Sequence, residues 1–336
     1  MTAPSNGFRL LVKATIAATF LLIVLGGVVR VSDSGLGCGQ AHSGVNGWPL
    51  CRGDVVPGVS LHAVIEYCHR VTAGVVVVLM AALAVLAWRR YRGYRAIVVV
   101  ATAASILVIA QALLGAATVD NNLNEGLVAA HLGMAMLLLA LVIYLWRAAR
   151  PGVAGAPPVD GGSGFRALAV VSQAILFVAI IAGGYMAGTE HFGRAGERLG
   201  AGAHEACGKE FPGCAHAGLF PFGSSRLVNI HLAHRLAVYL TVIAVGALIV
   251  VALRRRPSEG IRRTAIVLGG LLVLQFALGV LNVVLGEYEA LIAAHLTAAT
   301  LLWATLTTIT IQLFRVPAPL PRSAASAART GEAVAT

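Results

Sequence analysis

Charged residues are scarce in this sequence, and acidic residues are scarcest. Only 12% of the 336 residues are Asp, Glu, Lys or Arg, while 58% are hydrophobic. A soluble domain carries about 25% charged residues, so the shortage excludes an ordinary water-soluble enzyme. It also excludes a disordered chain, which combines high charge with low hydrophobicity. With only five cysteines, the chain cannot be a disulfide-stapled scaffold either.

Long apolar runs take the place of charge. Each approaches the roughly 20 residues that span a bilayer, and the runs are continuous rather than alternating, which argues against membrane strands. The sequence therefore predicts an all-α polytopic membrane protein with eight transmembrane helices. The runs are 14–29, 71–88, 96–119, 126–146, 167–189, 236–253, 264–286 and 290–314, with the second and sixth extending back to about Ser60 and Leu227.

Basic residues are distributed unequally between the two sides of these spans. Seventeen of the 25 Lys and Arg residues fall in segments on one side, and most acidic residues fall on the other. By the positive-inside rule both termini are cytoplasmic, and the long loops 31–60 and 189–227 lie outside. The net charge of +11 then reflects membrane topology. It indicates a lipid bilayer as the surroundings and gives little support for a nucleic-acid partner.

The two halves of the chain resemble each other. Because four spans is an even number, both halves have the same orientation, and we expect two tandem four-helix bundles related by a pseudo-twofold along the membrane normal. The predicted domains are 1–150, a flexible cytoplasmic linker over 151–165, 166–315, and a disordered cytoplasmic tail over 316–336. At offsets of 164 or 165, Glu66–Arg70 matches His231–Arg235, Gln111–Gly115 matches Gln275–Gly279, and Leu127–Leu132 matches Leu291–Leu296.

Four histidines occupy matched positions within the predicted spans: His69 and His131 in the first half, His234 and His295 in the second. An ionisable residue inside a membrane is a functional hypothesis by default. Two imidazoles on facing helices of a bundle can ligate a haem iron axially. A purely structural role is the alternative, and zinc or copper is less favoured because the pairs lack further ligands. Small residues that a flat macrocycle would need are Gly74, Gly115, Gly133 and Gly279.

Glu66 marks a difference between the halves. It precedes His69 by three residues, one helical turn away on the same face, whereas the matching residue of the second half is His231. A poorly solvated carboxylate there suits proton handling, and a salt bridge to Arg70 is the alternative. Arg70 and its counterpart Arg235 are candidate contacts for haem propionates, or interfacial anchors. A structural or substrate-adjacent role is expected for His62.

Four cysteines form two pairs, each within one outer loop. Because the outer side is oxidising, the simplest expectation is a disulfide in each loop, Cys38–Cys51 and Cys207–Cys214. Thiol or electron exchange by these pairs is an alternative. The second pair, flanked by His204 and His216, also permits a metal site. Cys68 has no partner and is expected to be a buried thiol beside His69.

The combined pattern resembles the haem A synthase family along essentially the whole chain. No single motif is unique, but the combination is specific. The motifs are Glu66-x-x-His69-Arg70, Ala130-His131, His234-Arg235, Ala294-His295, Gly35-Leu36-Gly37-Cys38 and Trp48-Pro49-Leu50-Cys51. A departure from compact members is the insertion Gly39–Gly47 between the first two cysteines, and His231 is a second departure.

The resemblance implies a bacterial enzyme of the cytoplasmic membrane. It would oxidise the C8 methyl of haem O to a formyl group by successive hydroxylation, making haem A for cytochrome oxidase. Carried over by residue, His234 and His295 would ligate a resident haem b, and His69 and His131 would flank the substrate haem O. Glu66 would be the catalytic carboxylate. A farnesyltransferase would supply haem O, and the electron acceptor is unknown.

Two other readings remain open from the sequence. A di-haem b-type electron-transfer cytochrome explains the four histidines and the repeat, but it leaves Glu66 and the loop cysteines without a role. A transporter or haem-handling protein without chemistry predicts no change in the bound haem. Fold resemblance alone does not separate these readings.

Overall fold

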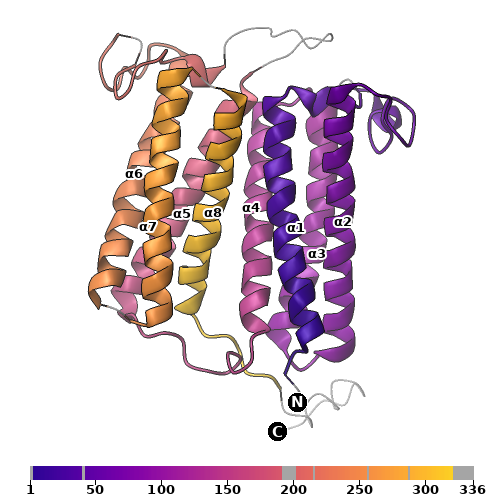
Figure 1. Ribbon diagram of the computed structural model, residues 1–336, viewed down its shortest axis with the longest axis vertical. Coiled ribbons are helices and arrows are strands. Elements are labelled where there is room, and N and C mark those ends of the chain that lie inside the picture. Colours follow the sequence, from indigo (N-terminus) through magenta and orange to yellow (C-terminus); the bar gives the residue numbers. More distant parts are fainter. Residues whose placement is uncertain are drawn as a thin grey trace.

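The computed structural model describes residues 3–39, 42–190, 202–214, 216–255, 257–286 and 288–320. Within these ranges the chain is helical and forms no β-strand apart from an isolated bridge between Cys51 and Asp54. Eight helices are long and apolar enough to cross a membrane, which confirms the predicted fold class. They are α1 (Asn6–Val31), α2 (Leu61–Arg90), α3 (Arg95–Asp120), α4 (Glu125–Ala148), α5 (Gly162–Gly188), α6 (Arg226–Arg255), α7 (Glu259–Leu285) and α8 (Glu289–Gln312) (Figure 1).

Short polar side chains set several helix starts. The hydroxyl of Ser60 accepts from the amide of Ala63 at the start of α2, and Ser258 does the same for Ile261 of α7. At α4, the side chain of Asn124 accepts from the amides of Gly126 and Leu127. Each contact satisfies an amide that has no partner within the helix. These caps explain why α2 and α7 begin several residues before their uncharged runs.

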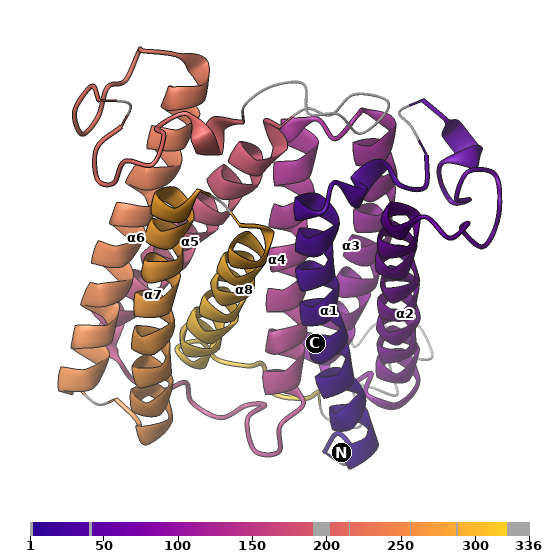
Figure 2. The same cartoon turned by 45° about the horizontal axis from the view of Figure 1, so that its top comes forward.

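The helices form two groups that follow the order of the chain. In Figures 1 and 2, α1–α4 lie together on one side and α5–α8 on the other. Between the groups, α4 packs against α5 and α8, and α1 packs against α8. Gly188 at the end of α5 lies so close to α4 that an added Cβ would be 2.5 Å from the Cα of Glu125. The pseudo-twofold relation between the groups stays a prediction.

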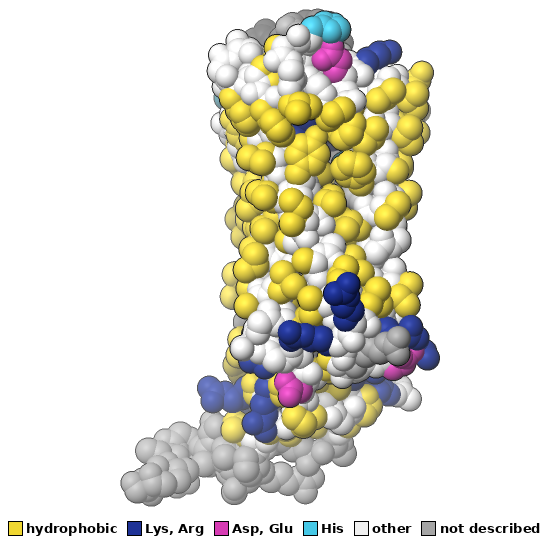
Figure 3. Space-filling model, turned by 90° about the vertical axis from the view of Figure 1, so that its left-hand side faces the viewer, with side chains coloured by type: hydrophobic (Ala, Val, Ile, Leu, Met, Phe, Trp, Pro, Cys, Tyr) yellow, Lys and Arg dark blue, Asp and Glu magenta, His cyan; other side chains and the backbone are white. Residues whose placement is uncertain are grey.

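The surface between the two ends of the bundle is apolar. Figure 3 shows a broad hydrophobic band between two polar ends. Most of the basic side chains in this view gather at one end, and a histidine lies at the other. Large apolar residues of the helices project outward, among them Val78, Ile106 and Ile243, each more than 60% exposed. An exposed apolar band of this kind is expected of helices that face lipid.

The linker between the halves is held in place along its described length. Its Gly155 and Val159 amides donate to the carbonyls of Val316 and Gln312, at 2.9 and 3.0 Å. Val316 is 1% exposed, and the amide of Leu320 donates to the carbonyl of Gly93 at 2.8 Å. The chain after α8 therefore pairs with this linker, whose Pro and Gly content predicts a flexible tether. The tail beyond Leu320 lies outside the described residues.

Both predicted disulfides are present, one in each of the two loops predicted to lie outside the membrane, the outer loops. Cys38 is bonded to Cys51, and Cys207 to Cys214. The first disulfide is buried against Ala63 of α2, and the second against Val228 and Leu232 of α6. Ala63 and Val228 are separated by 165 residues, the offset of the repeat. The two loops are therefore seated on corresponding helix starts.

Candidate functional site

The four repeated histidines share one local environment. Each imidazole lies against a glycine of the preceding helix, so closely that a Cβ on that glycine would be 3.0 or 3.1 Å from the ring Cε1. A side chain of any size at the glycine would therefore displace the ring. The pairs are Gly26 with His69, Gly115 with His131, Gly183 with His234, and Gly279 with His295. Two of these glycines, Gly115 and Gly279, were predicted, whereas Gly74 meets open space and Gly133 packs on Ile181 of α5.

The histidines also form two pairs in space, one in each half. His69 on α2 is near enough to His131 on α4 to interact electrostatically, and His234 on α6 stands in the same relation to His295 on α8. The Nδ1 atoms of His69, His131 and His295 are buried, and within the described residues they have no hydrogen-bond partner. Buried polar atoms without partners are unusual in proteins and point to a group that completes the site.

The second-half pair has more support around its rings. The Nδ1 atom of His234 lies 3.1 Å from the carbonyl of Ala179, and the side-chain amide of Gln275 lies 3.1 Å from Nε2 of His295. In the first half the matching Gln111 donates to the backbone carbonyl of His131 instead, at 2.7 Å. An imidazole whose Nδ1–H donates to a carbonyl presents Nε2 for metal ligation. His234 has this arrangement.

Glu66 is buried at the outer end of α2, directly under the first disulfide loop. Its Oε2 accepts from the amide of Cys38 at 2.7 Å, and its Oε1 pairs with the guanidinium of Arg70. Only 3% of the residue is exposed. Both oxygens therefore accept from donors, which is the hydrogen-bonding pattern of an ionised carboxylate. The salt bridge to Arg70 that the sequence left as an alternative is present.

The two arginines that follow His69 and His234 bind the outer loops. Arg70 donates to the carbonyl of Leu50 at 2.9 Å, and Arg235 donates to the carbonyl of Gly213 at 2.7 Å. Leu50 and Gly213 each stand between a cis proline and the second cysteine of their loop. Arg235 also reaches the carbonyls of Glu210 and Pro212, at 2.8 and 3.3 Å. The guanidinium groups therefore tie each disulfide loop to its helix.

His231 has the structural counterpart of the Glu66 contact. Its Nδ1 lies 2.9 Å from the carbonyl of Ala203, 28 residues earlier, and Glu66 likewise contacts Cys38, 28 residues earlier. His231 is 2% exposed. It is thus a loop anchor, a role that no motif in the sequence indicated.

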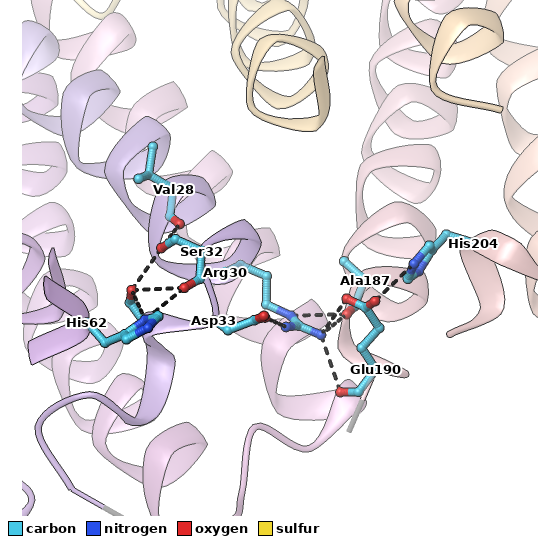
Figure 4. A network of polar contacts seen from close by, with 9 residues as sticks. Val28, Arg30, Ser32, Asp33, His62, Ala187, Glu190 and His204 are labelled. Atoms are coloured by element: carbon cyan, nitrogen blue, oxygen red, sulfur yellow. Dashed lines mark hydrogen bonds and ion pairs between the residues drawn. The ribbon is translucent and has the colours of Figure 1, made fainter. Parts of the chain in front are cut away.

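A polar network that sequence reasoning missed joins the two halves at the outer side (Figure 4). Arg30, at the end of α1, donates to the carbonyl of Ala187 at 3.1 Å and pairs with Glu190 at 3.5 Å. Glu190 also contacts His204 at 3.1 Å. Burial raises the pKa of Asp33, which lies 3.9 Å from Arg30, although Arg30 acts in the opposite direction. Arg30 stood in the sequence as an isolated basic residue, with no motif to reveal its partners.

The same network includes His62 of α2. Its Nδ1 lies 3.0 Å from the carbonyl of Ser32 and 3.2 Å from Oγ of Ser34. These contacts hold the first outer loop against α2. Of the two roles expected for His62, structural or substrate-adjacent, these contacts agree with the structural role.

Two expectations about cysteine and metal are revised. Cys68 is exposed and not buried, because it lies on the face of α2 that points away from the bundle, next to His69 in the sequence. Cys207 and Cys214 are bonded to each other, so they are not thiolate ligands of a metal between His204 and His216. Throughout the described part of the chain, no three His, Cys, Asp or Glu side chains form a metal-holding cluster.

The histidine pairs fit haem on observations of the structure itself. Each half offers two imidazoles from facing helices, three of the four Nδ1 atoms are buried without partners within the described ranges, and each ring is seated on a glycine. A haem held by two histidines takes one nitrogen from each and needs no third protein ligand. The fold and these sites define a polytopic helical membrane protein with two inward-facing histidine pairs.

Comparison with known proteins identifies the family. The sequence pattern of the cytochrome oxidase assembly proteins (COX15-CtaA) matches residues 58–307. A haem A synthase of Halalkalibacterium halodurans is 29% identical over 306 residues, covering 90% of this chain and 96% of the relative. Haem A synthases of Alkalihalophilus pseudofirmus and Bacillus cereus are 36% and 37% identical over 140 and 135 residues, covering 41% and 39% of this chain and 45% and 42% of theirs. The chain belongs to this family, as its motifs predict.

Proposed function

We propose that the chain oxidises the C8 methyl of haem O to a formyl group, by successive hydroxylation and loss of water, and so produces haem A. The family membership supports the overall reaction. The observation that carries the assignment of roles is the asymmetry between two otherwise matched sites. Both have a glycine-seated histidine pair, but Glu66 stands beside one pair and His231 beside the other.

The second half is the site for a resident haem b, with His234 and His295 as its ligands. The Ala179 carbonyl at Nδ1 of His234 leaves Nε2 of that ring for a metal, whereas the Gln275 amide at Nε2 of His295 leaves Nδ1. Both contacts would fix the orientation of their rings. Such outer partners orient metal-binding histidines. When bound, haem b supplies one-electron redox chemistry. The protein's own part is to hold the two rings and to keep the site apolar.

The first half is the site for the substrate haem O, flanked by His69 and His131. Glu66 is the catalytic carboxylate. It is held by Cys38 and Arg70 as an anion, which suits it either to accept a proton or to stabilise positive charge at the carbon being oxidised.

Arg70 and Arg235 remain candidates for propionate contact. A guanidinium has five N–H donors. Arg70 donates to one loop carbonyl and to Glu66, and Arg235 donates to three loop carbonyls. In the second half, Nε of Arg235 is buried and has no acceptor within the described residues. A propionate at the outer edge of the site would supply one.

The orientation proposed from the charge distribution places both termini in the cytoplasm of a bacterium and both disulfide loops outside. The start of α1 and the end of α8 lie at the same end of the bundle, opposite the disulfide loops (Figure 1). A farnesyltransferase would supply haem O from the membrane. An electron acceptor is a further partner that the oxidation requires.

Haem analysis tests this function directly. The chain is expressed in a bacterium that makes haem O and lacks its own haem A synthase, and extracted haems are separated by chromatography. We expect haem A in the cells, and haem b together with haem O or haem A in the purified protein. If the cells contain haem O but no haem A although the expressed protein is present in their membrane, the proposal is contradicted.

The equal seating of all four histidines also fits a di-haem b-type cytochrome. In that case both halves of the purified protein would hold haem b, and Glu66→Gln would leave electron transfer nearly unchanged. A synthase would instead lose haem A formation in that variant. The two functions are therefore separable with one substitution.

A further inference from the structure

Each half contains a pair of adjacent glycines whose members touch different halves of the molecule. The pairs are Gly26-Gly27 on α1 and Gly183-Gly184 on α5. The first glycine of each pair seats a histidine of its own half. A Cβ on Gly26 would lie 3.1 Å from Cε1 of His69, and a Cβ on Gly183 would lie 3.0 Å from Cε1 of His234.

The second glycine of each pair meets the other half. A Cβ on Gly27 would lie 2.4 Å from Cδ2 of Leu296, and Leu296 directly follows His295. In the same way, a Cβ on Gly184 would lie 3.0 Å from Cδ2 of Leu132, which directly follows His131. The two contacts are related by the repeat.

Helix geometry explains why two adjacent glycines are needed. Neighbouring residues of a helix point about 100° apart. Helix α1 packs against both α2 and α8, and α5 packs against both α6 and α4. The first glycine of each pair faces the next helix of its own half, and the second glycine faces a helix of the other half. Gly27 and Gly184 are buried, so a methyl group there has no room to turn away. A glycine inside a helix costs about 1 kcal/mol relative to alanine, and here close contact requires it.

We propose that the two glycine pairs are positioning elements that couple the two histidine pairs across the interface between the halves. The backbone of α1 joins the seat of His69 to the seat of the Leu296–His295 segment, and α5 joins His234 to the Leu132–His131 segment. Because packed interiors transmit strain, a change at the second glycine of either pair moves a ligand-bearing segment of the other half. The inference rests on the proposed function, in which both pairs hold haem.

The coupling makes a crossed prediction that a general packing role does not. Gly27 lies on α1 of the first half, yet Gly27→Ala should alter the resident haem b of the second half through Leu296. The adjacent change Gly26→Ala should leave haem b unaltered and weaken haem binding in the first half through His69. On α5 the order reverses, with Gly183→Ala altering haem b and Gly184→Ala altering the first half.

The experiment uses purified full-length protein with its resident haem b. Electron paramagnetic resonance and visible spectra report the ligand geometry of haem b, and titration with haemin reports binding in the first half. We expect changed haem b g-values for Gly27→Ala and Gly183→Ala only. For Gly26→Ala and Gly184→Ala we expect haemin affinity to fall about tenfold, the change that an overpacking cost near 1.4 kcal/mol produces.

Matched controls separate coupling from a general loss of packing. Gly246→Ala on α6 and Gly270→Ala on α7 add the same methyl where nothing lies within 4 Å, and both should match the wild type. Leu296→Ala removes the atoms that Gly27→Ala would strike, so the double variant should recover the wild-type spectrum. Recovery would show an interaction energy between the two positions.

The outcomes distinguish the coupling from the function on which it rests. If the wild type shows a bis-histidine haem b spectrum and Gly27→Ala leaves it unchanged, or if Leu296→Ala fails to restore a changed spectrum, the coupling is wrong and the proposed function stands. If the wild type itself binds no haem b, the proposed function is wrong and the coupling with it.

Discussion

The two outer loops are held to the bundle by matching contacts from α2 and α6. The contacts differ in one residue, because a glutamate in the first half stands where the second half has a histidine. In the first half Glu66 holds the amide of Cys38, and in the second His231 contacts the carbonyl of Ala203, each spanning 28 residues. In both halves an arginine four residues later reaches the carbonyl that precedes the second cysteine. The link from loop to helix is thus common to both halves, and the carboxylate is not.

This comparison separates structure from chemistry. A histidine fastens a loop of the same kind, so a carboxylate is not needed for that purpose. The buried charge of Glu66 requires Arg70 and a backbone amide to offset its desolvation. Its presence where a histidine would hold the loop favours a chemical role in the first half. Variants at matched positions test this comparison, beginning with those that should have the largest effects.

Removing a histidine should separate the roles of the halves most strongly. His234→Ala or His295→Ala would remove one of the two proposed ligands of haem b, and we expect most haem b to be lost from the purified protein. His69→Ala or His131→Ala should leave haem b in place and stop haem A formation. Absorption spectra of the purified variants and chromatography of cell haems measure both quantities.

The reverse pattern would exchange the two assignments. If the first-half variants lost haem b and the second-half variants retained it, the substrate site would lie in the second half. Gln275→Leu provides an intermediate case. Because its amide supports His295 at 3.1 Å, its loss should weaken haem b binding without abolishing it.

Glu66→Gln and His231→Gln form the next comparison. Glutamine keeps the shape of glutamate but carries no charge, so Glu66→Gln should lower the rate of haem A formation about 10²- to 10⁴-fold, the usual range for a lost acid–base group. His231→Gln can still donate to Ala203 and should retain most activity. Both variants should keep haem b. Equal losses in the two variants would mean that Glu66 serves only to hold its loop.

Removing the first disulfide should reduce haem A formation more than removing the second. The difference should be smaller than that between Glu66→Gln and His231→Gln. Removing a native disulfide typically costs about 2–4 kcal/mol, and either loop should loosen. Only the first loop holds Glu66, through the amide of Cys38. Cys38→Ser with Cys51→Ser should therefore reduce haem A formation more than Cys207→Ser with Cys214→Ser, at similar haem b content. Equal activity in both double variants would show that the loop does not position Glu66.

Much of the fold was predictable from the sequence. The eight spans, the two disulfides and the family follow from apolar length, from the oxidising side of the membrane and from spaced motifs. The starts of α2 and α7 depend on the caps Ser60 and Ser258, which lie outside the uncharged runs. Gly115 and Gly279 were recognised because they share the repeat, but what they touch became clear only when the helices were placed.

Other features depend on contacts between segments far apart in the sequence. Arg30 reaches Ala187 over 157 residues, and the linker pairs with the chain beyond α8. The exposure of Cys68 depends on which face of α2 turns inward, and an apolar helix surrounded by lipid gives a weak signal for that direction. The sequence also left two roles open for Arg70 and Arg235, and their loop contacts appear only in three dimensions.

The arginines give the smallest expected effect. Lysine keeps the charge but is a single point donor, so it cannot serve several acceptors held in a fixed fan. Arg235 donates to three loop carbonyls, whereas Arg70 donates to one loop carbonyl and to Glu66. We therefore expect Arg235→Lys to lower the melting temperature in detergent by on the order of 2–4 °C, the shift for about 1 kcal/mol, and Arg70→Lys to lower it less.

Because the ammonium group introduced by Arg70→Lys would still neutralise Glu66, that variant should retain more haem A formation than Glu66→Gln. If Arg235→Lys instead lost much of its haem b while its melting temperature stayed near that of the wild type, the guanidinium would contact a haem propionate directly.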